Sequence, residues 1–284
     1  MCNISYTYES LCFYRYFCID NLIIMKSNTK NNGFVFSGGG SKGIAHAGVL
    51  QYLQEQNIKP SCIAGSSAGA IVAAMYAFGK KPEEILEFFK SIYFFHWKHF
   101  TFKKAGIVDS ESFKKYFDGI FGENTTLAEL KIPTYITATD MVKGKLKIFS
   151  PETRVVDAVL ASTAVPGMIS PYIIKEKLYS DGGILNHFPA DLLVGKCESI
   201  IGVYVSPVQN LEAKNLNSIK SVTYRALELL TANSSFQKFN YCDVIIEPKE
   251  LTNYNTFETN KSKMNAIYKI GYEEAKKHFE SIGT

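Results

Sequence analysis

Gly65-Ser66-Ser67-Ala68-Gly69 is the most informative segment of this 284-residue chain. A short apolar run, Cys62-Ile63-Ala64, precedes it, and an alanine-rich run, Ala70 to Phe78, follows it. This order predicts a strand, a sharp turn and a helix, with Ser67 in the turn and its hydroxyl at a helix N-terminus. The flanking glycines allow the tight turn and the close approach of a substrate. A serine held in this way is typical of attack on an ester or another acyl carbon.

A second strand, turn and helix come just before this motif. Phe34-Val35-Phe36 predicts the strand, Gly38-Gly39-Gly40-Ser41-Lys42-Gly43 the turn, and Ile44 to Gln56 the helix, with apolar residues at helical spacing. The glycine turn allows three interpretations: a nucleotide-binding loop, a tight turn that needs positive φ, and an oxyanion hole. A dinucleotide site needs an acid near the end of the next strand, which ends here in Ala64-Gly65-Ser66. Because Ser67 occupies the next turn of the same kind, the sequence favours the oxyanion hole.

Two charged residues accompany these motifs. Lys42, at the start of the first helix, is either a solvated lysine or a group that adds positive potential beside an anionic substrate or intermediate. Asp181-Gly182-Gly183 follows a short strand-like run and predicts a turn. A carboxylate there can accept the proton of a serine hydroxyl. By itself the motif favours the simpler interpretation, an aspartate that bonds its own backbone in a turn.

The histidines do not predict a triad of serine, acid and histidine. His187 follows Asp181 by only six residues, and His278 lies in a charged C-terminal helix. His46 is in the first helix, where packing or hydrogen bonding is expected. His96 and His99 lie in an aromatic stretch. We therefore expect that no histidine is the base.

In this order, the glycine loop, the Gly-x-Ser-x-Gly motif and Asp-Gly-Gly resemble the patatin-like phospholipase family. Ala161-Ser162-Thr163-Ala164-Val165-Pro166 is similar to the fourth block of that family, and the likeness spans about Gly33 to Val205. It implies a three-layer α/β/α sandwich with a mostly parallel central sheet. It also implies a Ser67–Asp181 dyad, in which Ser67 is the nucleophile and Asp181 the proton acceptor. The remaining site residues that it implies are the oxyanion-hole loop (Gly38, Gly39, Gly40, Ser41, Lys42, Gly43), the nucleophile elbow (Gly65, Ser66, Ala68, Gly69) and the aspartate turn (Gly182, Gly183).

The resemblance also implies an activity. It is the hydrolysis of carboxylic esters in phospholipids, lysophospholipids or related lipids through an acyl-enzyme, with no metal and no cofactor. Transfer of the same acyl group to another alcohol remains an alternative, as does a nucleotide-binding module built on Gly38 to Gly43.

Composition sets broader limits. With 46% hydrophobic and 20% charged residues, the chain suits one large domain with ample core. A net charge of +4 with no basic run does not indicate a nucleic-acid-binding protein. The six cysteines have no metal-ligand spacing, so we expect a reducing compartment and no disulfide framework.

The N-terminal residues do not fit a targeting signal. Residues 1–24 are rich in Tyr, Phe, Cys and Ile but are interrupted by Arg15 and Asp20, so they match neither a signal peptide nor a membrane span. We expect translation to begin at Met25, or residues 1–24 to be a dispensable extension, with one catalytic domain over residues 25–284. The absence of a clear signal predicts a cytoplasmic protein.

Further strands are predicted over 135–139, 146–149, 200–205 and 244–246, and further helices over 155–161, 219–230 and 261–279. Strands that alternate with helices predict an α/β sheet covered on both faces. The densest aromatic stretch, Phe88 to Phe102, carries interleaved lysines up to Lys104. Its aromatics are expected to cover the sheet; the alternative is a lid or patch, Phe88 to Lys104, that contacts a membrane surface peripherally.

Overall fold

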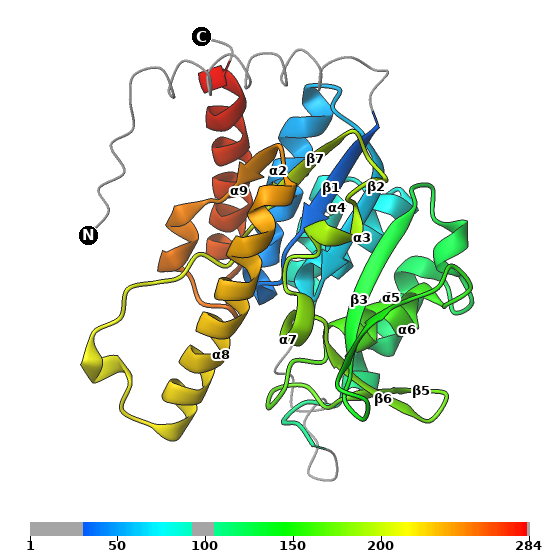
Figure 1. The fold of residues 1–284 in the computed structure, drawn as a ribbon, viewed down its shortest axis with the longest axis vertical. Helices are drawn as coiled ribbons and strands as arrows, with labels where there is room; N and C mark the ends of the chain where they lie inside the picture. Colours follow the sequence, from blue (N-terminus) through cyan, green and yellow to red (C-terminus); the bar gives the residue numbers. More distant parts are fainter. Residues whose placement is uncertain (1–30, 93–104, 283–284) are drawn as a thin grey trace.

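The computed structural model describes residues 31–92 and 105–282, and its centre is a single mixed β-sheet (Figure 1). The strand order is β5-β6-β3-β2-β1-β7-β8, with β4 also paired to β3. The strands are β1 (Asn32–Phe36), β2 (Pro60–Ser66), β3 (Thr134–Asp140), β4 (Lys145–Ile148), β5 (Tyr172–Ile174), β6 (Lys177–Asp181), β7 (Ser199–Val203) and β8 (Val244–Ile246). The central strands β3, β2, β1, β7 and β8 are parallel, whereas β4, β5 and β6 add antiparallel pairs on one side.

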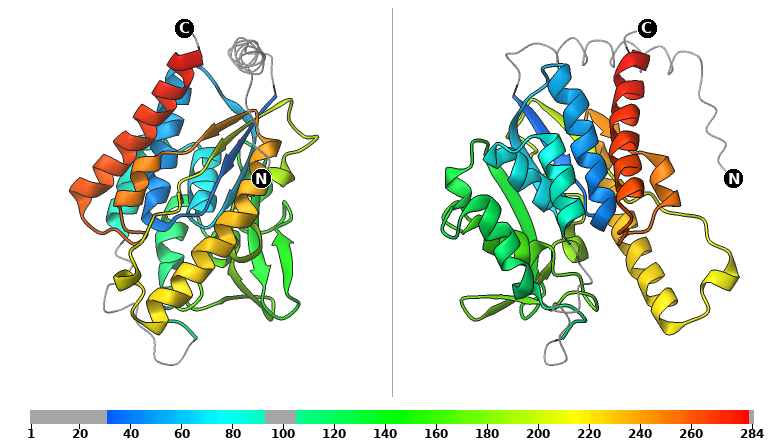
Figure 2. Two further views of the ribbon diagram at one scale, coloured as in Figure 1. Left: turned by 60° about the vertical axis from the view of Figure 1, so that its left-hand side comes forward. Right: turned by 180° about the vertical axis from the view of Figure 1, so that it is seen from behind.

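Helices lie on both faces of this sheet (Figure 2). They are α2 (Ile44–Glu55), α3 (Ala68–Phe78), α4 (Pro82–Ser91), α5 (Lys114–Phe121), α6 (Val155–Ser162), α7 (Gly183–Asn186), α8 (Ile219–Phe236) and α9 (Lys261–Ile282). The predicted α/β fold with a mostly parallel central sheet is therefore confirmed. Strand β5, which forms a short antiparallel hairpin with β6, was not predicted.

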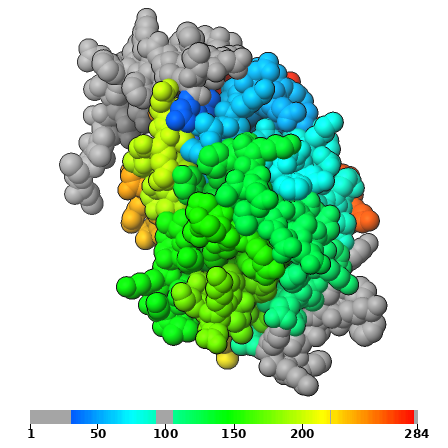
Figure 3. Space-filling view, turned by 90° about the vertical axis from the view of Figure 1, so that its right-hand side faces the viewer, coloured from blue at the N-terminus to red at the C-terminus, as the bar shows by residue number. Residues whose placement is uncertain are grey.

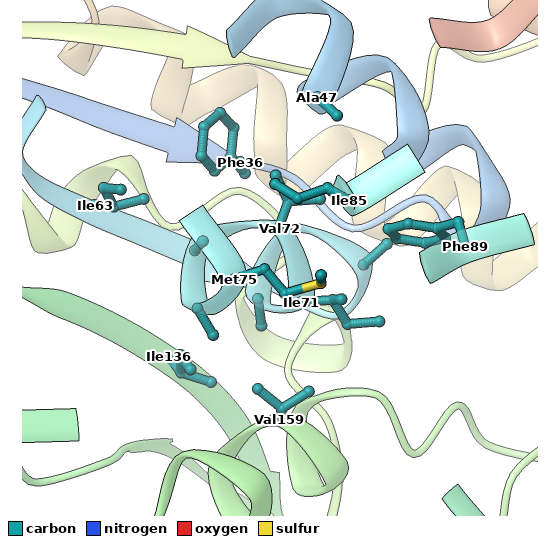
Figure 4. Close-up of a cluster of buried hydrophobic side chains, with 14 of the residues drawn as sticks. Phe36, Ala47, Ile63, Ile71, Val72, Met75, Ile85, Phe89, Ile136 and Val159 are labelled. Carbon is teal, nitrogen blue, oxygen red and sulfur yellow. The ribbon is translucent and has the colours of Figure 1, made fainter. Parts of the chain in front are cut away.

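The side-chain alternation of β1 divides the core between the two faces. Phe34 and Phe36 join a large cluster with α2, α3, α4 and α9, and Val35 joins a smaller one with Phe188 and Tyr204. Figure 4 shows part of the large cluster, in which Phe36 lies near Val72. The alanine-rich sequence of α3 allows this helix to pack closely on β2, and it ends at Gly79, whose φ of 109° is left-handed.

The prediction that the cysteines form no disulfide framework was wrong for one pair. Cys62 on β2 and Cys197, just before β7, form a disulfide. Strands β2 and β7 flank β1, and the glycine at position 33 leaves room, since a Cβ there would lie 2.8 Å from Sγ of Cys197. The two cysteines are 135 residues apart in the sequence, so only the sheet order brings them together.

The aromatic stretch from Phe88 begins as core. Phe88 and Phe89 are buried in α4, and the ring of Phe88 lies 5.4 Å from that of Phe117. For these two residues the core interpretation is confirmed. The rest of the predicted lid from residue 93 on, and the expectations for residues 1–24, lie outside the described residues. Figure 3 shows the side of the molecule where residues from β3 to α7 form most of the surface.

Within the described ranges, no helix is long and apolar enough to cross a bilayer.

Candidate active site

The register of the sheet brings the three motifs to one edge. β1 ends at Phe36 opposite Gly65 of β2, so the glycine loop and Ser67 leave neighbouring strands at the same end. On the other side, Ser66 of β2 pairs with Thr137 of β3, and Ala138 of β3 pairs with Asp181 of β6. Ligands of open α/β sheets bind at the carboxyl ends of the parallel strands. The predicted nucleophile, proton acceptor and oxyanion loop therefore meet where such a ligand binds.

Ser67 occupies a strained turn between β2 and α3. Its φ of 53° and ψ of −125° are unusual for a residue with a side chain, and such strain persists only where the surroundings fix it. The N–H of Ser67 donates to Oγ of Ser162 (2.9 Å), and its carbonyl accepts from the N–H groups of Ala70 and Ile71. Gly65 and Gly69 approach so closely that a Cβ on Gly65 would collide with the carbonyl of Gly69.

Asp181 uses its two carboxyl oxygens differently. Oδ1 accepts the N–H of Gly183 (2.6 Å), which is the turn interaction expected of an aspartate in this position. Oδ2 is buried and has no hydrogen bond of standard geometry. Both interpretations of the Asp-Gly-Gly motif are therefore compatible, because the turn occupies one oxygen and leaves the other free.

Burial raises the pKa of Asp181 to about 6. The Ser67 hydroxyl and the Gly183 amide oppose this rise, since each stabilises the charged carboxylate. The hydroxyl thus lies close to the carboxylate, although no well-aligned hydrogen bond joins them. In free enzymes such contacts are often long and shorten when substrate binds.

The segment from Ser162 to Ala164 connects the two turns. The Ser162 carbonyl accepts the N–H of Gly182 (3.2 Å), while its hydroxyl accepts the N–H of Ser67. The Ala164 carbonyl accepts both the N–H of Asp181 (2.9 Å) and the hydroxyl of Ser180 (2.6 Å). Sequence similarity marked this block but did not reveal its role, which depends on hydrogen bonds to residues far away in the chain.

The glycine loop keeps two of its amide groups free. The N–H of Gly38 donates to the His187 carbonyl, that of Ser41 to the Thr256 carbonyl, and that of Lys42 to the Gly39 carbonyl. Among the residues that the structure describes, no hydrogen bond uses the N–H of Gly39 or Gly40. Gly40 has a φ of 57°, a conformation that glycine adopts without strain.

Two serines hold the loop in place. The Gly38 carbonyl accepts hydrogen bonds from the hydroxyls of Ser37 and Ser206, both at 2.9 Å. Because a trans peptide unit is planar, fixing this carbonyl also fixes the N–H of Gly39, which points the opposite way. The sequence alone gave no signal for Ser206, which lies 168 residues after Gly38.

Lys42 is buried, so the interpretation as a solvated lysine was wrong. Burial lowers the pKa of its ammonium group, and the charge of Glu228 on α8 opposes this. The Lys42 side chain is thus held within the loop, and the charge of Glu228 favours its protonated form.

His187 lies beside the site, which its place in the sequence did not suggest. A Cβ on Gly38 would be 2.6 Å from Cε1 of His187 and 3.2 Å from Cβ of Ser67. A Cβ on Gly183 would be 2.8 Å from Nδ1 of His187 and 2.9 Å from Oδ1 of Asp181. The imidazole thus fills the space next to both glycines, and burial lowers its pKa to about 4. At neutral pH it is an uncharged ring that shields the aspartate turn.

His46 supports the loop from the opposite side. It is fully buried, its Nε2 lies 2.9 Å from the Ser37 carbonyl, and its pKa is lowered to about 3, chiefly by burial. In the neutral imidazole, Nε2–H donates a hydrogen bond to this carbonyl, which lies just before the glycine loop. His46 thus has the packing and hydrogen-bonding role that the sequence predicted. Within the described residues, no group of three His, Cys, Asp or Glu side chains could hold a metal ion.

Comparison with known proteins agrees with this geometry. The family model of patatin-like phospholipases matches residues 34–194, more than half of the chain. The chain belongs to the patatin-like phospholipase family. The match includes the glycine loop, Ser67, the Ser162 block and Asp181.

Individual relatives are more distant. An NTE family protein of Mycobacterium bovis is 31% identical over 186 residues, which cover 61% of this chain and 48% of that protein. The lysophospholipase NTE1 of Mycosarcoma maydis is 22% identical over 186 residues, covering 63% of this chain and 10% of that protein. The chain therefore spans half or less of these relatives. VipD of Legionella pneumophila shares the fold, with a TM-score of 0.58, 16% identity and coverage of 89% of this chain and 67% of that one.

Proposed function

We propose that this patatin-like protein is a serine lipid acyl hydrolase that uses Ser67 as nucleophile and Asp181 as general base. The observation that carries the proposal is the asymmetry of the buried carboxylate. Its Oδ1 is occupied by the Gly183 amide, and its Oδ2 has no partner of standard geometry although the Ser67 hydroxyl is close. A pKa of about 6 makes Asp181 a stronger base than an ordinary aspartate, yet leaves it ionised at neutral pH.

In the acylation step, Asp181 takes the hydroxyl proton while Oγ of Ser67 bonds to the ester carbonyl carbon. The carbonyl oxygen becomes negative and accepts hydrogen bonds from the free amides of Gly39 and Gly40, which is stabilisation by preorganised dipoles. When the tetrahedral intermediate collapses, the bond to the alcohol oxygen breaks, and Asp181 returns the proton to the departing alkoxide.

Deacylation repeats these steps with water. Asp181 takes a proton from water as its oxygen attacks the acyl carbon, and then protonates Oγ of Ser67 as the fatty acid leaves. Lys42 is buried in this loop, and its protonated form adds positive potential where the oxyanion forms.

The substrate class follows from the family and from the lysophospholipase among the relatives. We propose phospholipids, lysophospholipids or related lipid esters. Peripheral membrane contact was predicted for Phe88 to Lys104. Because Phe88 and Phe89 belong to the core, we propose this contact only for the part from residue 93 on.

Labelling with a fluorophosphonate tests the mechanism directly. The probe forms a covalent bond only with an activated serine, and intact mass counts the adducts. We expect one adduct on the wild type and none on Ser67→Ala or Asp181→Asn, with unchanged circular dichroism. An unlabelled but folded wild-type protein, or an adduct that persists in Ser67→Ala, would contradict the assignment.

A further inference from the structure

Helix α8 has its polar and apolar faces reversed relative to an ordinary surface helix. Its inward positions, which are buried or half-buried, are mostly polar: Ser221, Tyr224, Arg225, Glu228, Thr231, Ala232 and Ser235. Its outward positions are mostly apolar, and Ile219, Val222, Leu229 and Leu230 are 89%, 51%, 46% and 68% exposed. A surface helix normally places its apolar stripe against the core. The apolar side chains of α8 therefore face away from the protein.

The inner face of α8 borders the active site. Glu228 pairs with Arg225 (2.7 Å) and also acts electrostatically on Lys42 of the oxyanion loop. The Tyr224 hydroxyl would be 3.7 Å from a Cβ on Gly167, just after the Ser162 block. Glu228 is the single carboxylate of α8 and is turned toward the protein. The outer face of the helix therefore carries no negative charge.

Helix α7 carries further exposed apolar side chains next to α8. Helix α7 follows Asp181 directly and packs against α8, and its Ile184 and Leu185 are exposed. The N-terminal half of α8 extends past the carboxyl ends of the parallel strands, the end at which Ser67 lies (Figures 1 and 2). The exposed apolar side chains of both helices are thus carried by elements at the end of the sheet where Ser67 lies.

We propose that the outer face of α8, with Ile184 and Leu185 of α7, docks on a lipid surface. This inference rests on the proposed lipid hydrolase function. With 18 residues, α8 is about 27 Å long and can lie in the plane of the interface, with its apolar side chains at the boundary between headgroups and acyl chains. A lipid surface is the occupant that fits, because the face is apolar, carries no carboxylate and lies at the same end of the sheet as the proposed lipid hydrolase site.

Vesicle flotation tests this proposal without interference from turnover. The Ser67→Ala protein is mixed with extruded phosphatidylcholine vesicles, and the bound fraction is measured. In that background, Leu230→Gln should weaken binding roughly 5- to 10-fold, and Val222→Gln/Leu230→Gln further, because each apolar side chain is withdrawn from the interface. Glutamine preserves helix propensity. The matched control is Val194→Gln, which changes a 50% exposed valine near the amino ends of the strands and should leave binding unchanged.

A second measurement separates docking from catalysis. With Ser67 intact, Val222→Gln/Leu230→Gln should hydrolyse a water-soluble p-nitrophenyl ester like the wild type, and vesicle phospholipid at least about 10-fold more slowly. In the Ser67→Ala background, the proposal would be overturned if Val222→Gln/Leu230→Gln bound vesicles as strongly as Ser67→Ala alone. It would also be overturned if Ser67→Ala alone did not bind vesicles. A change from dimer to monomer in light scattering would assign the face to a second copy instead. If the soluble ester is not cleaved by the wild type, the proposed function fails, whereas flotation still decides the docking surface.

Discussion

The turn that holds Ser67 and the turn that holds Asp181 are stabilised in different ways. Ser67 has a strained backbone, and hydrogen bonds fix both its N–H and its carbonyl. Asp181 has an ordinary turn hydrogen bond but a buried carboxylate oxygen with no well-aligned partner. The first turn therefore fixes the position of the proposed nucleophile through the backbone, whereas burial in the second raises the basicity of the proposed base.

Both turns depend on the Ser162 block, which bonds to Ser67 on one side and to Gly182 on the other. Variants of each turn should thus differ in what they change. Those at the elbow should lower the rate at every pH, and those around Asp181 should also change the pH dependence.

The largest effect is expected from Asp181→Asn. Loss of the base should lower kcat for a lipid ester by at least about 10,000-fold, the loss in kcat that a serine protease shows when the aspartate of its triad is replaced by asparagine. Asp140→Asn is the matched control, because Asp140 also accepts backbone N–H groups in a turn after a strand. It should retain most of the activity. Near-wild-type turnover by Asp181→Asn would contradict the role of Asp181.

The same substitution should stabilise the fold at neutral pH. Asp181 has a folded pKa of about 6 against an ordinary value of 3.8, so its protonated form contributes stability that is lost as pH rises from about 4 through 6. Asparagine does not ionise, so the variant keeps its stability as the pH rises. The difference in unfolding free energy between Asp181→Asn and wild type should therefore grow by about 2 kcal/mol between pH 4 and pH 8. Denaturant titrations at both pH values measure it, and a constant difference would exclude a buried, ionised carboxylate.

Ser162→Ala should have the next largest effect. It leaves the N–H of Ser67 buried without an acceptor, which destabilises the native elbow by about 1–3 kcal/mol. If the elbow shifts as a result, the labelling rate should fall roughly 10- to 100-fold. Thr163→Val is the control, since the Thr163 hydroxyl bonds only carbonyls of its own helix, those of Val159 and Leu160. Stopped-flow labelling with the fluorophosphonate compares the two. Equal rates would mean that the elbow keeps its geometry without Ser162.

Substitutions at His187 should change the pH profile more than the maximal rate. The wild-type rate should fall below about pH 6, where Asp181 becomes protonated. His187→Ala admits water to the aspartate turn, so the pKa of Asp181 should decrease and the acid limb should move to lower pH by up to about one unit. His187→Phe keeps the space filled and should leave the limb in place. If both variants lose activity alike, the imidazole itself takes part in proton transfer.

The smallest effect is expected from Ser206→Ala. It removes one of the two hydroxyls that hold the Gly38 carbonyl, while Ser37 keeps the other. We expect a loss in kcat of about 3- to 10-fold with little change in KM, because the oxyanion forms only along the reaction path. Ser206→Thr keeps the hydroxyl and should restore the rate. An increase in KM alone would place Ser206 in substrate binding rather than in support of the oxyanion hole.

Local patterns in the sequence were sufficient for most of the fold. Apolar periodicity and turn residues placed most of the described helices and strands within a few residues, although α8 runs to Phe236 rather than to residue 230. The elements that were not predicted are α5, α7 and β5. These elements are short, so they contain too few residues to show a period. The disulfide was missed because its cysteines become neighbours only when β2 and β7 flank β1.

The chemistry proposed for the site was predictable from the sequence, because a nucleophile elbow, a glycine loop and an aspartate turn each need particular residues at adjacent positions. The surroundings of these parts depend on the tertiary structure. Burial raises the pKa of Asp181, His187 covers its turn, and Ser162 and Ser206 fix backbone groups from 95 and 168 residues away. The reversed polarity of α8 likewise became visible only when its packed face was known. Burial and long-range hydrogen bonds depend on the whole packed chain, and a local pattern cannot encode them.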